Sequence, residues 1–538
     1  MRFISSFIPL ICQCRFLFQV LFLAWIIACL TGNPAHAGVS AVAVGKANGR
    51  EVPKWPSCDG HCTTQNISFV HVSDLHAQYN LDKNGSSPVG RIRGYYEQVK
   101  KENPFTLFTN AGDDYEKGSI AEELSEGKTT RQVVHALRYD VRTLGNHDFA
   151  WGFEELLRYS NDPSAVVLAA NVKLNSGKKG FYPERTPGWT DFSVITVGCV
   201  RIGFLGLVTK PVGENDQPYD GPYYRHHPEL QTNFNFAGIA RDIIARHRQE
   251  VDVLVLISHL GLQEDIVLAE ETSGIDLILG GHTHSITQTP LRVKNTTIVH
   301  TGAYGENIGR MDIEYDIHNK RIAESRFHLI ANRPGEVPDD EHFERRVADI
   351  LKPYEQELYK TIADVNQNQK KETMALIAAR AAVETLKVDA AFISEDMVWQ
   401  EWNKGELTQQ DILNAFRVER QPAASPGHSS LYRMEVEGRD LIHAIAVLRN
   451  SAYWGPSRIN PKTSYTIALQ KLPALNQKEF FGKSIGYSQP KPAAELWETV
   501  VSFAMGQKSA GLSLNQGLQD RNSATLVSLY KDLQQRIP

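Results

Sequence analysis

Residues 141–152 read VRTLGNHDFAWG, a short apolar run and a glycine followed by Asn146, His147 and Asp148. The apolar, β-branched run favours a strand, and the glycine favours a turn directly after it. Three polar side chains of different chemistry therefore stand just beyond the predicted end of a strand. Open α/β folds bind ligands at the carboxyl ends of their strands, so this stretch predicts a fold class and a place for chemistry together.

The same pattern recurs on both sides of this stretch, where short apolar runs alternate with segments of helical length. The runs are ISFVHVS (67–73), FTLFTNA (105–111), VVLAANV (166–172), VDVLVLIS (251–258) and IDLILGG (275–281). Strands separated by helix-length connections are typical of βαβ units with largely parallel sheet. Consecutive strand patterns near 191–209 and 296–330 indicate a mixed or second sheet packed on the first. The predicted fold class is α/β.

Polar side chains follow several of these runs. The seven candidate metal ligands are Asp74, His76, Asp113, Asn146, His259, His282 and His284. A single Asp or His in such a place is more often a helix cap or a hydrogen-bonded loop residue. Their recurrence after successive strands instead predicts one shared site. Carboxylates, an amide oxygen and imidazoles together suit a dinuclear centre for zinc, manganese, iron or cobalt.

These motifs resemble those of the calcineurin-like metallophosphoesterase superfamily. They are Asp-x-His (74, 76), Gly-Asp (112, 113), Gly-Asn-His-Asp (145–148), His259 and Gly-His-x-His (281–284), in this order. The stretches AGDDYEKGSIAEELSEGKTTRQVVHAL, AANV and GIDLILGGHTHS are similar, more closely, to bacterial secreted 5'-nucleotidases, and the likeness covers roughly residues 66–330. The resemblance implies a β-sandwich flanked by helices and a phosphoester hydrolase, with a phosphomonoesterase like the 5'-nucleotidases as the first expectation.

The resemblance also implies roles for the candidate ligands. One ion is then held by Asp74, His76 and His284, and the other by Asn146, His259 and His282. Asp113 bridges the two ions, and a shared carboxylate offsets the repulsion between neighbouring cations. A metal-bridging hydroxide attacks phosphorus, while Asn146 and His147 face the substrate and His147 stabilises the transition state or protonates the leaving group.

Position 150 departs from the family pattern. The 5'-nucleotidases usually carry an Asp there that orients the catalytic histidine, whereas this chain has Ala150. In the protein phosphatase branch, the partner carboxylate stands three residues after the bridging Asp, and a phosphate-binding Arg follows it. Glu116 and Lys117 occupy those two offsets from Asp113, so Glu116 is expected to orient His147 and Lys117 to contact phosphate. The alternative is that both are solvated loop residues.

The chain is expected to hold two folded domains joined by a connector. Residues 66–335 form the predicted catalytic domain, 336–360 a charged, solvated linker helix with a proline kink, and 361–538 a smaller α/β domain resembling that of the 5'-nucleotidases. The arginine, phenylalanine clamp and glycine loop by which that family binds nucleotides do not appear. The candidate replacements for substrate binding are Arg417, Arg420, Tyr453, Trp454 and Arg458.

The substrate expected from this pattern is a small-molecule phosphoester, with nucleotides as the first candidates. Alternatives that keep the metals are a cyclic-nucleotide phosphodiesterase and a nucleotide-sugar hydrolase. A non-catalytic metal-binding relative is a third alternative, because position 150 lacks a carboxylate and the nucleotide clamp is missing. The thiosulfohydrolase branch is disfavoured, since it carries Gly-His-Trp-Glu where this chain has Gly-Asn-His-Asp. The formal net charge of −5 disfavours a nucleic-acid polymer as partner, and the oligomeric state is left open.

The N-terminus predicts export. Residues 1–37 combine Arg2, Arg15 and the apolar run 16–30 with a small-residue site ending at Ala37, as in a cleavable signal peptide. A periplasmic or secreted protein is expected. One alternative is a lipoprotein anchored at Cys29. Another is a retained membrane span, although the run is shorter than the ~20 apolar residues that a span needs.

Cysteine positions complete the expectations. Residues 38–65 form a predicted extension in which a Cys58–Cys62 disulfide closes a short loop, as an oxidising compartment allows. Zinc binding with His61 is the alternative, although structural zinc normally takes four ligands. Cys199 is expected to be a buried core thiol.

Overall fold

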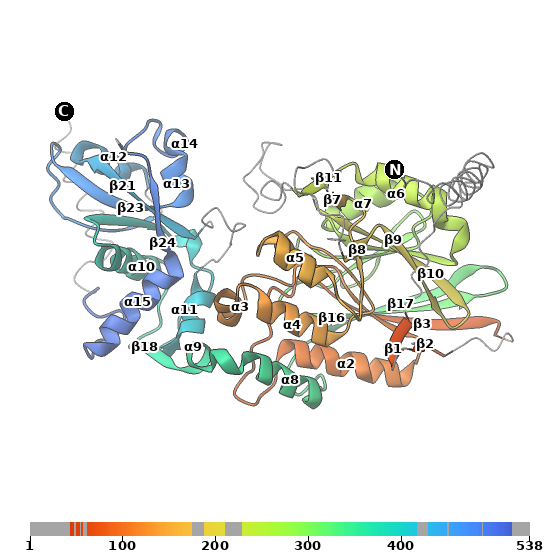
Figure 1. The fold of residues 1–538 in the computed structure, drawn as a ribbon. Coiled ribbons are helices and arrows are strands. Elements are labelled where there is room, and N and C mark those ends of the chain that lie inside the picture. The colour runs from red at the N-terminus through yellow and green to blue at the C-terminus, as the bar shows by residue number, and fades with distance from the viewer. Residues whose placement is uncertain are drawn as a thin grey trace, which may run out of the picture. The chain divides into compact units, whose positions relative to one another are not determined.

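A computed structural model describes residues 44–47, 50–53, 55–56, 62–174, 188–209, 229–416, 429–448, 451–486 and 488–518. They fall within Val42–Pro538 and are drawn in colour in Figure 1. The predicted signal peptide, the alternative anchor Cys29 and Cys58 lie outside the described residues. The expectations for the signal peptide and the anchor therefore stay predictions. Among the helices described, none is long and apolar enough to cross a membrane.

The first sheet has seven strands in the order β17-β16-β3-β4-β5-β6-β8. Its strands are β3 (Thr64–Val72), β4 (Thr106–Asn110), β5 (Val141–Thr143), β6 (Val166–Leu168), β8 (Trp189–Thr190), β16 (Asn307–Asp316) and β17 (Arg321–Ala331). The strands from β3 to β8 are parallel neighbours, and β16 and β17 close one edge in antiparallel pairing. The predicted βαβ arrangement is confirmed for these strands.

The second sheet has six strands in the order β14-β15-β13-β12-β10-β9. Its strands are β9 (Phe192–Val197), β10 (Val200–Val208), β12 (Val253–His259), β13 (Leu277–Gly280), β14 (Leu291–Val293) and β15 (Thr296–His300). Apolar residues of both sheets form one core, with Phe69 and Leu107 from the first sheet and Val255 and Leu279 from the second fully buried. This shared core makes the two sheets a sandwich.

Helices cover the two outer faces of the sandwich (Figure 1). The first sheet packs on α2 (Pro88–Glu102), α4 (Lys128–Leu137) and α5 (Phe153–Ser160). The second sheet packs on α6 (Phe236–His247) and α7 (Leu262–Glu271). The layers follow the predicted order of helix, sheet, sheet, helix. The strands that precede the candidate ligands are divided between the two sheets.

The linker region, residues 336–360, was predicted to be a solvated helix, and the structure differs. Helix α8 (Glu341–Leu351) buries Phe343, Val347 and Leu351 and packs on α2 and α4. The chain then turns through a 3-10 segment, Lys352–Tyr354, that contains Pro353, and continues as α9 (Glu355–Tyr359). The expectation of a solvated helix is therefore wrong. The proline does mark the break between the two helices.

The C-terminal part is built on a five-stranded sheet in the order β22-β19-β23-β21-β24. The strands are β19 (Ala390–Ser394), β21 (Ser430–Glu437), β22 (Ser451–Trp454), β23 (Ser464–Gln470) and β24 (Lys491–Glu495). Helices α10 (Lys371–Leu386) and α15 (Leu496–Ser509) pack together and bury apolar residues shared with this sheet. A smaller pair, β18 (Thr361–Val365) and β20 (Gly405–Thr408), accompanies them. This part is α/β, as expected.

Cys199 is not a core thiol. It is disulfide-bonded and only partly buried, in the turn between β9 and β10. A tight turn at a sheet edge leaves its central residues accessible, so the apolar runs on either side do not indicate burial of the turn itself. Cys62 is exposed and is not in a disulfide, so the prediction of a Cys58–Cys62 disulfide is wrong.

Candidate metal centre

The candidate ligands lie in loops that follow strands of both sheets. Asp74 and His76 follow β3, Asp113 follows β4, and Asn146 follows β5. From the second sheet, His259 is the last residue of β12, and His282 and His284 follow β13. The sandwich therefore brings two sets of strand ends to one place, and the expected convergence of all seven residues occurs.

Backbone strain is concentrated in these loops. Asp74, Asp113 and His284 have φ of 53°, 58° and 53°, in the left-handed region that L-residues rarely occupy. His76, Glu116, Lys117 and His282 have positive φ as well. Strained residues of this kind persist where the surrounding fold over-determines them, and they cluster at functional sites.

Two glycines of the motifs allow the loops to touch. A Cβ on Gly145 would stand 2.1 Å from Oδ1 of Asp113, and one on Gly112 would stand 2.3 Å from the backbone nitrogen of Gly145. Gly112 also has a φ of 87°. Only residues without a side chain fit this approach. The glycines therefore place Asp113 against the loop that carries Asn146 and His147.

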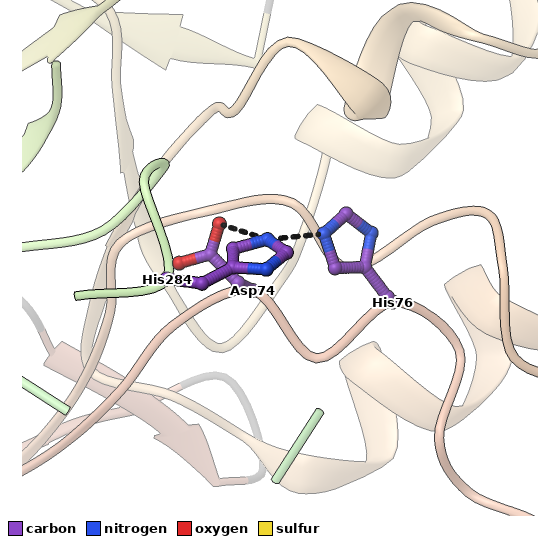
Figure 2. Close-up of side chains that lie close together, drawn as sticks. All are labelled: Asp74, His76 and His284. Atoms are coloured by element: carbon purple, nitrogen blue, oxygen red, sulfur yellow. Dashed lines mark hydrogen bonds and ion pairs between the residues drawn. The ribbon is translucent and has the colours of Figure 1, made fainter. Parts of the chain in front are cut away.

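The first group of ligands is Asp74, His76 and His284 (Figure 2). Nε2 of His76 lies 3.1 Å from Nε2 of His284, which lies 3.7 Å from Oδ1 of Asp74. Nδ1 of His76 is 3.0 Å from the carbonyl oxygen of Tyr115. Because a carbonyl can only accept, Nδ1 carries the proton, and the lone pair of Nε2 in the neutral ring points into the group.

The second group is Asp113, His259 and His282. Nε2 of His259 lies 3.0 Å from Oδ2 of Asp113 and 3.1 Å from Oδ1 of Asn146. Its Nδ1 lies 2.6 Å from the carbonyl oxygen of Ala111, so Nδ1 again donates. Asp113 also forms a group with His76 and His147. It therefore stands between the two sets of ligands.

Burial controls protonation of the imidazoles. It lowers the pKa of His282 to about 3 and, together with the charge of Lys117, that of His284 to about 4. Burial lowers the pKa of His76 as well, again with Lys117 as the second cause. These rings are neutral near pH 7, which is the form that coordinates a metal.

The carboxylates respond differently to burial. Burial raises the pKa of Asp74 to about 7. Burial would raise the pKa of Asp113 too, but the charge of His259 outweighs it and holds that pKa well below its usual range. Conversely, burial opposes protonation of His259, yet Asp113 raises the pKa of His259 to about 9. The ionised carboxylate of Asp113 therefore stabilises a positive charge beside it.

The donor set fits divalent cations. Buried Asp and His side chains aim lone pairs at one another, and backbone carbonyls fix the outer nitrogens of His76 and His259. Converging lone pairs are unfavourable without a positive charge between them. Mixed carboxylate, amide and imidazole ligands suit borderline divalent ions, so the residues present match the group that the motifs imply.

His147 has a carboxylate partner other than residue 150. Its Nδ1 donates to Oε2 of Glu116, whose side chain is fully buried. Nζ of Lys117 lies 3.2 Å from Nε2 of His147. Ala150 is buried in the apolar core beside Phe149. Burial, followed by the charge of Lys117, lowers the pKa of His147 well below its usual range. The alternative of a solvated Glu116 is excluded by its burial.

Sequence reasoning missed the position of Asp148. Its Oδ2 accepts from the backbone nitrogens of Gly145 at 2.7 Å and Asp113 at 3.2 Å, and its Oδ1 accepts from Asp114 at 2.9 Å. Asp148 therefore joins the loop after β4 to the loop after β5. The signal in the sequence is a carboxylate, Asp148, two residues after the candidate ligand Asn146.

The described candidates in the C-terminal part have different surroundings. Arg417 and Arg420 lie outside the described residues. Tyr453 is buried in the apolar core of the sheet, and its hydroxyl donates to the carbonyl oxygen of Pro456. The guanidinium of Arg380 lies over the ring of Trp454. Arg458 is exposed. The contacts of Tyr453 favour a packing role, and substrate binding by Tyr453, Trp454 and Arg417 stays a prediction.

The fold and the ligand groups are similar to those of known metal-dependent phosphoesterases. Residues 67–285 match the model of the calcineurin-like phosphoesterase family, and all seven candidate ligands lie within this stretch. The snake venom 5'-nucleotidase of Crotalus adamanteus is 24% identical over 336 residues, covering 56% of this chain and 54% of that protein. The chain spans about half the length of the curated relatives that it matches in this way.

Solved structures share the fold over both parts of the chain. The 5'-nucleotidase precursor of Thermus thermophilus superposes with a TM-score of 0.62 at 18% identity, covering 82% of this chain and 96% of that one. The sulfate thiohydrolase SoxB, also of Thermus thermophilus, superposes with a TM-score of 0.57 at 17% identity, covering 86% and 96%. These likenesses establish the fold, and substrate choice depends on the site itself.

Proposed function

We propose that the protein is a metal-dependent phosphoester hydrolase with a dinuclear centre, acting on small phosphomonoesters such as nucleotides. The observation that carries the proposal is the place of Asp113 between two sets of ligands. Asp113 contacts His259 and also groups with His76, which belongs to the other set. A carboxylate in this position would be a ligand available to both cations.

Two bound divalent cations would supply Lewis acidity toward phosphoryl oxygens and activate water for in-line attack on phosphorus. The ligands proposed for one ion are Asp74, His76 and His284, and those for the other are Asn146, His259 and His282. The neutral ring of His76 and the ionised Asp113 are in the protonation states that such binding requires. His259, whose pKa is raised to about 9, would release its proton when a cation binds.

His147 is the proposed catalytic residue of the chain itself. Because Nδ1 donates to Glu116, Nε2 is the ring atom that faces Lys117 and the site. A histidine held in this way exchanges a proton at Nε2 with the leaving-group oxygen. Glu116 is the positioning residue that fixes the tautomer and favours the charged ring.

Lys117 and Asn146 are the proposed phosphate contacts. Nζ of Lys117 lies 3.2 Å from Nε2 of His147, the ring atom proposed to face the leaving group. An ammonium group at this point offers charge to an oxyanion and keeps its donors in a partly buried setting. A phosphomonoester dianion gains more from that charge than a diester with a single negative charge, which favours monoesters.

The test is hydrolysis by the full-length mature protein after metal removal. Chelator-treated protein is reloaded with manganese, zinc or cobalt and assayed on 5'-AMP, cyclic AMP, a nucleotide sugar and p-nitrophenyl phosphate. Metal-dependent release of phosphate from the monoesters supports the proposal. Preference for cyclic AMP or the nucleotide sugar would refute the monoester assignment and favour the corresponding alternative. The absence of hydrolysis with every metal would identify a non-catalytic relative and refute the proposal.

We also propose that the protein is exported, with cleavage after Ala37. The disulfide at Cys199 supports an oxidising compartment. N-terminal sequencing of protein recovered from the native host tests this. A mature chain beginning at Gly38 in the periplasm or medium agrees with export, a lipid-modified Cys29 indicates the anchored alternative, and an uncleaved Met1 contradicts both.

A further inference from the structure

Tyr304 lies in the loop after β15 and packs against two of the proposed metal ligands. Its ring centroid is 5.4 Å from that of His76, with the planes tilted by 38°. It is 5.1 Å from the centroid of His284, with the planes at 80°, an edge-to-face contact. Aromatic rings at these separations attract and restrict one another's orientation. One side chain thus touches both imidazoles of the first ligand group.

The backbone of this loop is strained at Tyr304. Tyr304 has a φ of 58°, and the flanking Gly302 and Gly305 have φ of 85° and 66°. Glycine adopts this region freely, whereas a bulky aromatic residue does so at a cost. A tyrosine at a backbone position that glycine would fit better is a strained residue of the kind that occurs at functional sites.

The loop is fixed to the segment after β3 that carries Asp74. The backbone nitrogen of Tyr304 donates to the carbonyl oxygen of Asp74 at 2.8 Å. Ser73 Oγ donates to the carbonyl of Gly302 at 3.1 Å, and Asn332 Nδ2 donates to that of Gly305 at 2.7 Å. The position of the ring is therefore tied to the same segment that positions Asp74 and His76.

His284 differs from the other imidazoles in how it is held. His76 and His259 each donate from Nδ1 to a backbone carbonyl, the usual means of orienting a histidine ligand. Within the described part of the chain, Nδ1 of His284 has no such bond, and its side chain is 31% exposed. The groups that face its ring are Asp74, His76 and the ring of Tyr304.

We propose that Tyr304 is a positioning residue that orients His284, and with it His76, for binding the ion of the first group. The ring takes the place of the missing hydrogen bond at Nδ1 by confining the imidazole from its side. The inference rests on the proposed dinuclear centre, because it assigns Tyr304 to one of its two ions. Loss of the ring should therefore weaken one ion selectively and leave the other in place.

The test compares variants of the full mature protein by cobalt titration, following the visible absorption and the bound metal after dialysis. Tyr304→Phe keeps the ring, whereas Tyr304→Gly removes it and suits the left-handed backbone. Lys320→Gly is the matched control, because Lys320 has a φ of 50° on an exposed turn. Tyr304→Asn repeats the ring deletion with a residue that also tolerates this region.

Wild type, Tyr304→Phe and Lys320→Gly should each bind two cobalt ions and show the same visible absorption spectrum. Tyr304→Gly and Tyr304→Asn should bind one of the two about 10-fold more weakly, as for loss of a group that supports a metal ligand, with unchanged melting of the metal-free protein. If Tyr304→Gly binds both ions as tightly as wild type does, the inference is overturned and the proposed function is left intact. Weakening accompanied by a matching loss of metal-free stability has the same consequence. A wild type that binds no cobalt overturns both.

Discussion

The carboxylate of Glu116 accepts a hydrogen bond from Nδ1 of His147, so a residue three positions after Asp113 supplies the partner that Ala150 does not. Glu116 is fully buried and His147 is 8% exposed. The pair is therefore shielded from water, where a charge-assisted hydrogen bond is strongest. This relationship leads to the first prediction.

Replacing Glu116 by Gln should lower kcat about 100-fold, because His147 loses the carboxylate that fixes its tautomer and favours its charged form. Loss of that charge also lowers the pKa of His147, so the pH at which activity falls should move down. Steady-state kinetics across pH measures both. Metal content should match that of wild type and of Glu271→Gln, a change at an exposed site on α7. Unchanged kcat would discard the positioning role.

Ala150→Asp should not improve the enzyme. Ala150 is 3% exposed and packs in the apolar core, and His147 already has a carboxylate partner. A second buried carboxylate without a cation of its own should cost about 3 kcal/mol of unfolding free energy. Chemical denaturation measures this, with Ala323→Asp on the exposed face of β17 as control. A variant as stable and more active than wild type would show that position 150 is the better place for the partner.

Gly145→Ala should disturb the metal centre more than the rest of the fold. The added Cβ would stand 2.1 Å from Oδ1 of Asp113, so Asp113 or its loop must shift, at about 1–3 kcal/mol for overpacking. Metal content and activity should both fall. Gly506→Ala on α15 is the matched control, because nothing lies within 4 Å of its added Cβ. Full metal occupancy in Gly145→Ala would contradict the proposed closeness of the two loops.

Much of this site could be predicted from the sequence because its residues lie at the ends of strands. The alternation of apolar runs and turns shows where these strands end. The resemblance to the protein phosphatase branch, with its offset of three residues from the bridging Asp, pointed to Glu116, with a solvated loop residue as the alternative. The division of the strands between two sheets was harder to predict. The pattern of a strand does not show which strand it pairs with when the two are distant in sequence. Tyr304 carries no spacing signal at all. Its only mark is the pair of glycines, Gly302 and Gly305, around it.

The linker region shows a second limit. Phe343, Val347 and Leu351 follow a helical period in α8, but the charges between them suggested a solvated helix. One of those charges, Glu344, is buried and accepts hydrogen bonds from the backbone nitrogen and hydroxyl of Ser87. A charged residue with a specific buried partner cannot be told from a solvated one by composition.

Glu344 gives a pH-dependent prediction. Burial raises the pKa of Glu344 from 4.5 to about 7, so the folded state binds its proton more tightly than the unfolded chain. Its contribution to stability is present at acidic pH and is lost as pH rises through about 7. Glu344→Gln should therefore flatten the stability profile between these values. Melting temperatures across pH measure this, with exposed Glu341→Gln on the same helix as control. Identical profiles for wild type and Glu344→Gln would reject it.

The central claim is that Asp113 is shared by two cations, and the metal content of the purified mature protein tests it most directly. Chelated protein titrated with manganese should bind two ions per chain by equilibrium dialysis and mass spectrometry. Asp113→Asn should retain at most one, because its side chain keeps an oxygen but loses the charge that offsets two neighbouring cations. A wild-type stoichiometry of one or none, or two tightly bound ions in Asp113→Asn, would contradict the account.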